Sequence, residues 1–221
     1  MSATFKQNGQ DVRDRKKSYY YPEHFSGKAV LDALDIAAKR YPVATRDIFM
    51  QGMSGGAQFV HRFAIWAPNR VCAVAVNSCS WFDEPKQSAK LCAWLVTIGE
   101  SDPTFANSLD FINHLRESGV VPLFRYYTGM GHEGSSRVDS LDCAFFEYYD
   151  ELTRSKLIRK NSVSIKPVAP NATKDMPFVG DLQEWTFLEN TKENRDKIPE
   201  DCRVYLPSKE IAIEWQYQTG D

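Results

Sequence analysis

The sequence has 221 residues, 43% of them hydrophobic, and its 27 basic and 29 acidic residues leave a formal net charge of -2. A chain so near neutrality carries no long-range field that would recruit nucleic acid or an anionic membrane surface. It also has no apolar run long enough to cross a bilayer and no apolar signal-peptide core over residues 1–10, so we expect no nucleic-acid partner, no membrane, and a cytoplasmic location as written, or a secreted one if a longer precursor exists.

The elements predicted in chain order alternate between helices and strands. Apolar residues recur at helical spacing in the helices, whereas short apolar runs rich in Val, Ile and Leu are typical of strands covered on both faces. After an irregular opening over residues 2–27, the pattern predicts a helix over 27–40, a strand over 48–50, a helix from beyond residue 54 to 67, strands over 71–76 and 93–98, a helix over 106–117, a strand over 123–127 and a helix after 134. This alternation predicts an α/β fold with a mostly parallel sheet flanked by helices.

The chain changes character near residue 152, where the alternation of strands and helices stops. Residues 155–174 are basic and polar and are interrupted by Pro167 and Pro170, which is typical of a linker. Residues 176–221 recover aromatic and apolar side chains and predict a short helix over 207–215. We therefore expect a main domain over 1–154, a linker over 155–175 and a mixed C-terminal extension over 176–221. The extension should pack on the main domain, because it is too small to bury its own aromatic residues.

Ser54 lies in the run Gly52-Met53-Ser54-Gly55-Gly56, which matches the pattern GxSxG. The match alone is weak, but here it follows a predicted strand and opens a predicted helix, the setting in which a sharp turn presents a serine hydroxyl. The three glycines remove side chains where the turn is crowded and where a substrate approaches. The run predicts a nucleophilic serine, and a glycine-rich turn without catalysis is the alternative.

A serine hydroxyl needs a base within hydrogen-bonding distance and a carboxylate that orients that base. His132 follows the strand predicted over 123–127, and Asp102 follows the strand predicted over 93–98. Both are therefore expected at the carboxyl ends of strands, where open α/β sheets place their ligands. Glu100 is the chief alternative for the acid and Glu133 for a charge near the base.

The three other histidines compete poorly for the role of base. His61 is expected to face away along a helix, His114 lies amid a polar helix face, and His24 precedes the ordered core. We interpret each of them as structural or solvated.

In these settings Ser54, Asp102 and His132 resemble the α/β-hydrolase fold, and specifically its polyhydroxybutyrate-depolymerase-like and feruloyl-esterase-like branch. The resemblance covers residues 25–149 and includes the chain order Ser, Asp, His. It implies a serine esterase in which the serine forms an acyl-enzyme, the histidine transfers the proton, and the backbone amide of Gly55 helps to bind the oxyanion. It implies no metal and no cofactor.

The chain departs from that family before Ser54. The hydrolase sheet has eight strands and its serine follows the fifth, whereas only one helix and an irregular segment precede Ser54 here, with residues 3–5 as a candidate remnant of the fourth strand. The chain is thus interpreted as truncated at its N-terminus and as lacking the loop that supplies the second oxyanion donor. The strand over 48–50 would then lie on an open edge that invites pairing, so we expect either a homo-oligomer or aggregate formed through this edge, or a piece of a longer protein.

The leading hypothesis is a carboxylic-ester hydrolase acting on a small-molecule ester through an acyl-enzyme on Ser54. Trp81, Phe82 and Phe105 follow strand ends and are candidates for the substrate pocket, with ordinary loop packing as an equal alternative. The alternative function is a catalytically silent hydrolase-like binding domain, or a fragment without the oxyanion loop.

Overall fold

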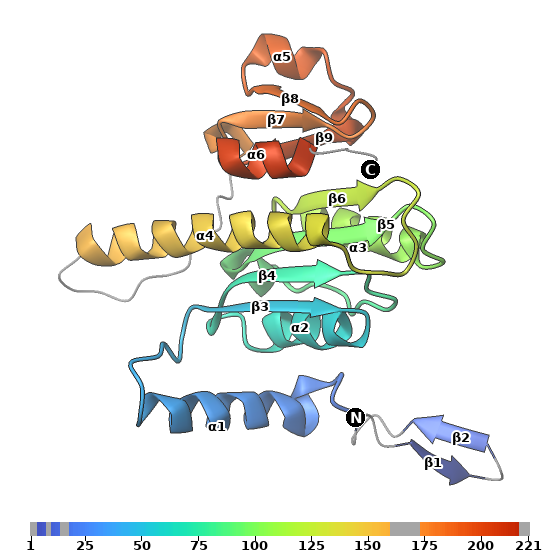
Figure 1. The fold of residues 1–221 in the computed structure, drawn as a ribbon, viewed down its shortest axis with the longest axis vertical. Helices are drawn as coiled ribbons and strands as arrows, with labels where there is room; N and C mark the ends of the chain where they lie inside the picture. The colour runs from blue at the N-terminus through green and yellow to red at the C-terminus, as the bar shows by residue number, and fades with distance from the viewer. Residues whose placement is uncertain (1–3, 8–9, 14–17, 160–172, 217–221) are drawn as a thin grey trace.

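The computed structural model describes residues 4–7, 10–13, 18–159 and 173–216. A four-stranded parallel sheet lies between helices, and a three-stranded antiparallel sheet packs beside it (Figure 1). The parallel strands are β3 (Ile48–Met53), β4 (Val71–Asn77), β5 (Ala93–Gly99) and β6 (Leu123–Tyr127), which pair in that order. All seven residues of β4 and of β5 are buried, because helices cover both faces of these central strands.

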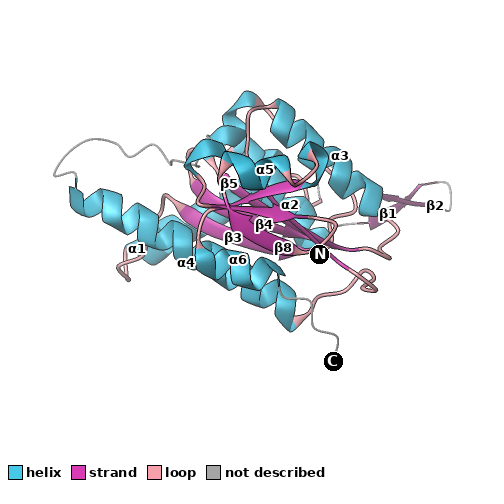
Figure 2. Ribbon diagram, turned by 90° about the horizontal axis from the view of Figure 1, so that it is seen from above, coloured by secondary structure: helices cyan, strands magenta, loops and turns pink. Residues whose placement is uncertain are grey.

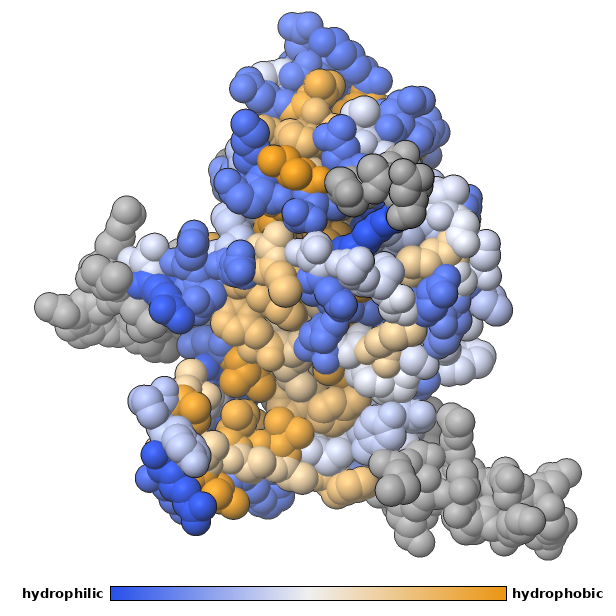
Figure 3. Space-filling view, viewed as in Figure 1, coloured by the Kyte–Doolittle hydropathy of each residue, from blue (hydrophilic) through white to orange (hydrophobic). Residues whose placement is uncertain are grey.

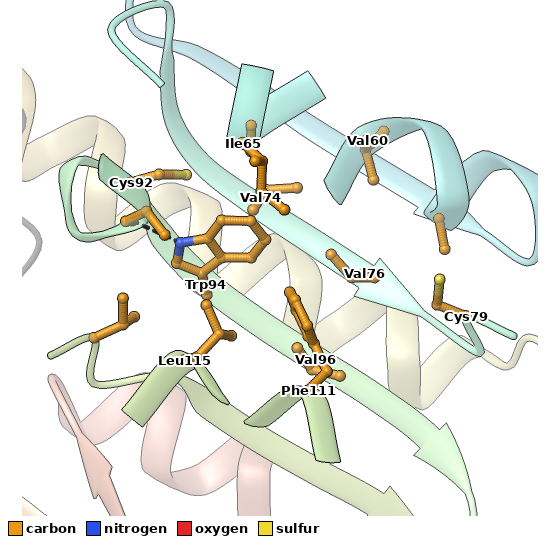
Figure 4. Close-up of a cluster of buried hydrophobic side chains, with 14 of the residues drawn as sticks. Val60, Ile65, Val74, Val76, Cys79, Cys92, Trp94, Val96, Phe111 and Leu115 are labelled. Atoms are coloured by element: carbon orange, nitrogen blue, oxygen red, sulfur yellow. Dashed lines mark hydrogen bonds between the residues drawn. The ribbon is translucent and has the colours of Figure 1, made fainter. Parts of the chain in front are cut away.

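One face of the sheet is covered by α2 (Gly55–Trp66) and α3 (Phe105–Glu117), and residues of α1 (Gly27–Ala38) pack against the same core. Trp94 of β5 lies at the centre of this core, where its ring meets Phe111 of α3 and its Nε1–H donates to the Ala89 carbonyl at 2.8 Å (Figure 4). The hydrogen bond allows the polar end of this indole to be buried without an unsatisfied donor.

The opposite face is covered by α4 (Ser136–Arg159), and α6 (Lys209–Gln216) lies side by side with α4 and packs against the antiparallel sheet (Figure 2). The antiparallel sheet, in the order β8-β7-β9, consists of β7 (Phe178–Asp181), β8 (Thr186–Glu189) and β9 (Arg203–Leu206). Short helical segments complete the described C-terminal part and the connection before β5: Gln87–Leu91, Thr173–Asp175, α5 (Lys192–Asp196) and Glu200–Cys202.

The C-terminal part protects the β6 edge of the parallel sheet. Trp215 of α6 is fully buried, and its Nε1–H donates to the Phe124 carbonyl of β6 at 2.8 Å. The Tyr126 hydroxyl, also from β6, donates to the Leu182 carbonyl at 3.3 Å. Both bonds join the edge strand β6 to the C-terminal part of the chain. Packing against this edge explains why the C-terminal sequence contains aromatic residues.

The predicted fold class is confirmed, and the predicted strands and helices of residues 27–159 are present with small shifts at their ends. Gly119 ends α3 with φ +80°, and the Val120 amide donates back to the Leu115 carbonyl at 3.0 Å. The expected linker over 155–175 lies largely outside the described residues, although α4 continues to Arg159.

The prediction of irregular chain over residues 2–27 was wrong. Thr4–Gln7 (β1) and Gln10–Arg13 (β2) form an antiparallel hairpin, and Pro22–Ser26 forms a π-helical turn that leads into α1. The suggestion that residues 3–5 are a remnant of a fourth hydrolase strand is also wrong for the described residues, because β1 pairs with β2 and not with β3. The polar alternation of this short hairpin gave no apolar signal from which to predict it.

Within the described residues, Cys72, Cys79, Cys92 and Cys202 are buried cysteines outside any disulfide, and Cys143 is an exposed one. None of the helices in this part of the chain has the length and apolar character needed to cross a membrane. The described residues also include no group of three or more His, Cys, Asp or Glu side chains arranged to hold a metal ion.

Candidate active site

Ser54 lies at the sharp turn between the end of β3 and the start of α2. Its backbone has φ 54° and ψ -116°, a strained conformation for a residue other than glycine. A Cβ at Gly52 would overlap backbone atoms of Gly56, so the strand and the helix can meet this closely only with glycine at position 52. The expectation of crowding does not hold at Gly56, where a Cβ would meet open space.

Ser54, His132 and Asp102 form one continuous hydrogen-bonded chain. The Ser54 Oγ lies 2.9 Å from His132 Nε2, and His132 Nδ1 lies 2.6 Å from Asp102 Oδ2. With the imidazole proton on Nδ1, that nitrogen donates to the carboxylate and Nε2 accepts from the serine hydroxyl. The three residues come from the loops after β3, β5 and β6, so they meet at the carboxyl edge of the sheet.

The Asp102 carboxyl group is held in a fixed orientation by Thr104. Its Oδ1 accepts from the Thr104 amide at 2.8 Å and from the Thr104 hydroxyl at 2.7 Å, which leaves Oδ2 for His132. Burial raises the pKa of Asp102, but the hydrogen bonds from Thr104 and His132 outweigh it and hold this pKa below its ordinary value. The carboxylate is therefore ionised at neutral pH.

The proposed base is accessible to solvent, whereas the proposed acid is not. The Asp102 side chain is fully buried, whereas the His132 side chain is 36% exposed.

Gly99, at the end of β5, lies directly under the backbone of Met130 and Gly131, and a Cβ there would overlap both carbonyl groups. The absence of a side chain at position 99 thus lets the histidine loop approach the aspartate loop.

The sequence matches no protein-family model and no curated protein. Among solved structures it is similar to a protein of Bacillus cereus ATCC 10987, with a TM-score of 0.51 and 12% identity over 69% of this chain and 49% of that chain. It is also similar to S-formylglutathione hydrolase of Staphylococcus aureus, with a TM-score of 0.44 and 17% identity over 59% of this chain and 61% of that one. It is also similar to a ferulic acid esterase, with a TM-score of 0.43 and 18% identity over 56% of this chain and 58% of that one. The chain thus matches less than two thirds of the length of each of these three proteins.

The topology of the molecule itself decides the fold. Four parallel strands in consecutive order, a serine on a strained strand-to-helix turn, and an aspartate and a histidine after later strands occur together in one known architecture. The chain has part of the α/β-hydrolase fold.

The alternative acids and bases of this hydrolase-fold chain have other partners. Glu100 accepts from the Gly129 amide at 3.3 Å, and Glu133 accepts from the Gly131 amide at 3.2 Å, so both brace the histidine loop. His61 is buried, where its Nδ1 donates to the Ala57 carbonyl at 2.9 Å and its Nε2 accepts from a backbone amide. Burial lowers the pKa of His61 to about 4, which identifies it as a neutral structural histidine.

The three predicted pocket residues lie beside other aromatic residues or at the surface. Trp81 is 65% exposed and lines, with Phe82, a cavity of about 280 Å³ whose lining includes none of Ser54, Asp102 and His132. Phe82 stacks on Phe111 at a centroid distance of 4.2 Å, and Phe105 meets Tyr126 edge-on at 5.5 Å. Both phenylalanines thus pack against aromatic residues of α3 or β6, and a role in substrate binding stays a prediction.

Two residues beside the site were missed by sequence reasoning. The hydroxyl oxygen of Tyr19 lies 2.7 Å from where a Cβ on Gly55 would stand, and the ring of Tyr20 lies 2.9 Å from it. Both lie in the stretch of residues 2–27 that the sequence pattern predicted as irregular chain. The sequence feature that could have pointed to these two residues is the run of three consecutive tyrosines in an otherwise polar opening.

A buried polar network lies directly beneath the serine turn. Asp142 of α4 accepts from Asn77 Nδ2 at 2.6 Å and from Gln51 Nε2 at 2.9 Å, and the Thr97 hydroxyl donates to Asn77 Oδ1 at 2.9 Å. The Asn77 carbonyl in turn accepts from the Ser54 amide at 3.0 Å. Burial raises the pKa of Asp142 from 3.8 to about 6, and its Oδ1 has no hydrogen-bond partner among the described residues.

This raised pKa predicts a pH dependence of stability. Between about pH 4 and pH 6 the folded chain holds the Asp142 proton more tightly than the unfolded chain does, so this group makes unfolding easier as the pH rises. Asp142→Asn removes that effect. The difference in unfolding free energy, variant minus wild type, is therefore expected to increase by about 2 kcal/mol from pH 4 to pH 7.

Urea denaturation at a series of pH values measures this difference. Asp110→Asn, at an exposed carboxylate of α3, is the control and should show no comparable increase. An Asp142→Asn difference that stays constant with pH would refute the raised pKa.

Proposed function

We propose that this chain is a serine-dependent hydrolase of carboxylic esters. The observation that carries the proposal is the hydrogen-bonded chain from Ser54 through His132 to the buried carboxylate of Asp102. A serine hydroxyl is a weak nucleophile at neutral pH, and this arrangement supplies the base and the orienting acid that activate it.

In the proposed reaction the Ser54 Oγ attacks the ester carbonyl carbon while His132 Nε2 takes the hydroxyl proton. The tetrahedral intermediate collapses, the bond to the leaving oxygen breaks, and His132 returns the proton to the departing alcohol. Water then attacks the acyl-enzyme with the same histidine as base, which releases the acid and restores Ser54. Asp102 stays ionised throughout, holds the imidazole in the required tautomer, and stabilises the imidazolium.

The amide of Gly55 supports the proposal as the first oxyanion donor. Gly55 is the first residue of α2, so its N–H is one of the helix amides without an intrahelical acceptor. The N-terminal end of the helix also favours a developing negative charge. We propose a small-molecule ester as the substrate, because an ester carbonyl needs less activation than an amide and the leaving group departs as an alcohol.

Covalent labelling tests the proposal directly. A fluorophosphonate should add to wild-type protein at Ser54, as measured by intact mass and peptide mapping, and should not add to Ser54→Ala. Equal labelling of the two proteins would remove Ser54 from the reaction. A folded wild type that neither reacts with the probe nor hydrolyses a short p-nitrophenyl ester would favour the catalytically silent binding domain.

We also propose that β3 pairs with β3 of a second copy of this chain. Among the described strands β3 pairs only with β4, and apolar side chains gather on the face where β3 lies between α1 and α4 (Figure 3). The segment Ile48–Met53 carries no charge, so two copies related by a twofold axis would meet without like-charge repulsion.

Light scattering at protein concentrations of tens of micromolar measures this association. The expected mass is twice that of one chain, and the midpoint of thermal unfolding should rise with protein concentration. A single-chain mass together with an unfolding midpoint independent of concentration would contradict the dimer.

A further inference from the structure

Two tyrosine side chains cover the residue that follows the candidate nucleophile. A Cβ placed on Gly55 would lie 2.7 Å from the Tyr19 hydroxyl oxygen, 2.9 Å from Cε1 of Tyr20 and 3.0 Å from the Tyr20 hydroxyl oxygen. Glycine at position 55 thus allows a phenol to reach the start of α2, beside the amide that the proposed reaction uses for the oxyanion.

The Tyr19 hydroxyl lies close enough to the Gly55 amide for both groups to donate to one oxygen atom. A Cβ stands about 2.4 Å from the amide nitrogen of its own residue, so the Tyr19 oxygen lies at most about 5.1 Å from the Gly55 nitrogen. Two donors that each lie about 2.9 Å from one oxygen can be up to about 5.8 Å apart. One oxyanion can therefore accept from the Gly55 amide and the Tyr19 hydroxyl together.

The tyrosine segment is held in place by contacts from two other elements. The Ser26 hydroxyl donates to the Tyr19 carbonyl at 2.8 Å, and Tyr19 and Tyr20 meet edge-on with a centroid distance of 4.4 Å. Arg62 of α2 donates to the Tyr20 carbonyl at 3.5 Å and is itself fixed by Asp83 at 2.8 Å. A donor held before the reaction begins stabilises developing charge without reorganisation at the moment of reaction.

We infer that the hydroxyl of Tyr19 is the second oxyanion donor of this site. The inference rests on the proposed ester hydrolysis and replaces the backbone donor that the sequence was expected to lack. Tyr19 is chosen over Tyr20 because its hydroxyl oxygen is closer to the Cβ position of Gly55 than the hydroxyl oxygen of Tyr20, which also approaches through its ring edge.

Tyr19→Phe tests the inference with p-nitrophenyl acetate as the substrate. The variant keeps the ring and loses only the hydroxyl, so kcat should fall by about 10²-fold while KM changes by less than about twofold, because the hydroxyl acts on the transition state. The affinity for phenylboronic acid, whose serine adduct places an oxygen in the oxyanion position, should fall by a comparable factor.

Two further variants sharpen the test. Gly55→Ala would displace the Tyr19 hydroxyl, because a Cβ at position 55 would overlap it. The fold decrease in kcat of the double variant should therefore be smaller than the product of the two single decreases. Tyr21→Phe is the matched control, because the Tyr21 ring lies under Arg62 and against His24, and it should keep the wild-type kcat.

The outcomes separate this inference from the proposed function. A wild type that hydrolyses the ester through Ser54 and a Tyr19→Phe variant with kcat lowered less than about threefold would overturn the inference alone. A larger loss of kcat in Tyr20→Phe than in Tyr19→Phe would overturn the choice of Tyr19. A folded wild type without any Ser54-dependent hydrolysis would overturn both.

Discussion

Ser54→Ala is expected to lower kcat for p-nitrophenyl acetate by at least about 10⁴-fold. In the proposed reaction the substitution removes the atom that forms the acyl bond. Neither His132 nor Asp102 would replace it, because both are proposed to act through the serine oxygen, 2.9 Å from the imidazole. The measurement is steady-state release of nitrophenolate, corrected for the hydrolysis that water and buffer cause without protein.

Ser101→Ala is the matched control for this experiment. Ser101 is an exposed serine in the aspartate loop, and its backbone amide, which donates to the Met130 carbonyl at 2.9 Å, is retained in the variant. It should therefore hydrolyse the ester at about the wild-type rate. A Ser54→Ala protein with the same thermal stability as the wild type and more than a tenth of its activity would exclude Ser54 as the nucleophile.

Asp102→Asn is expected to lower kcat by about 10⁴-fold, with little change in folding. Thr104 offers two donors to Oδ1, so the amide of the variant should keep its oxygen toward Thr104 and turn its NH₂ toward His132. That donor forces the imidazole proton onto Nε2, which then cannot accept the serine proton. The loss should appear in kcat and not in KM, since the carboxylate does not contact the substrate.

Glu100→Gln is the control that decides between the two candidate acids. Its carboxylate accepts from the Gly129 amide at 3.3 Å, and the amide oxygen of glutamine can do the same, so activity should change by less than about threefold. If Glu100→Gln lost more activity than Asp102→Asn, Glu100 would be the orienting acid.

Most of the main domain was predictable because its signals are local. The buried strands β4 and β5 are continuous apolar runs, and α2 and α3 carry apolar residues at helical spacing, so type and order followed from the pattern. The N-terminal hairpin, the small antiparallel sheet and the exact length of α4 carry weaker local patterns. The small antiparallel sheet in particular depends on pairing between segments far apart in the sequence, such as Phe178 with Leu206.

The sequence by itself determined which residue types could perform the chemistry and in what order they follow strands. Ser54 after β3, Asp102 after β5 and His132 after β6 could be predicted because parallel strands bring their carboxyl ends to one edge. Glycine at position 52 was likewise interpretable as a requirement of the turn.

Only the tertiary structure decided how far apart these groups lie and what surrounds them. The distances of 2.9 and 2.6 Å, the two Thr104 bonds that leave one oxygen of Asp102 for His132, and the approach of Tyr19 to Gly55 all join residues through folded loops. Periodicity reports which face of an element is buried, but it carries no information on where loops from separate elements meet. For that reason the nucleophile, base and acid could be proposed from the sequence, whereas the proposed second oxyanion donor could be inferred only from the packing of the tyrosine segment against α2.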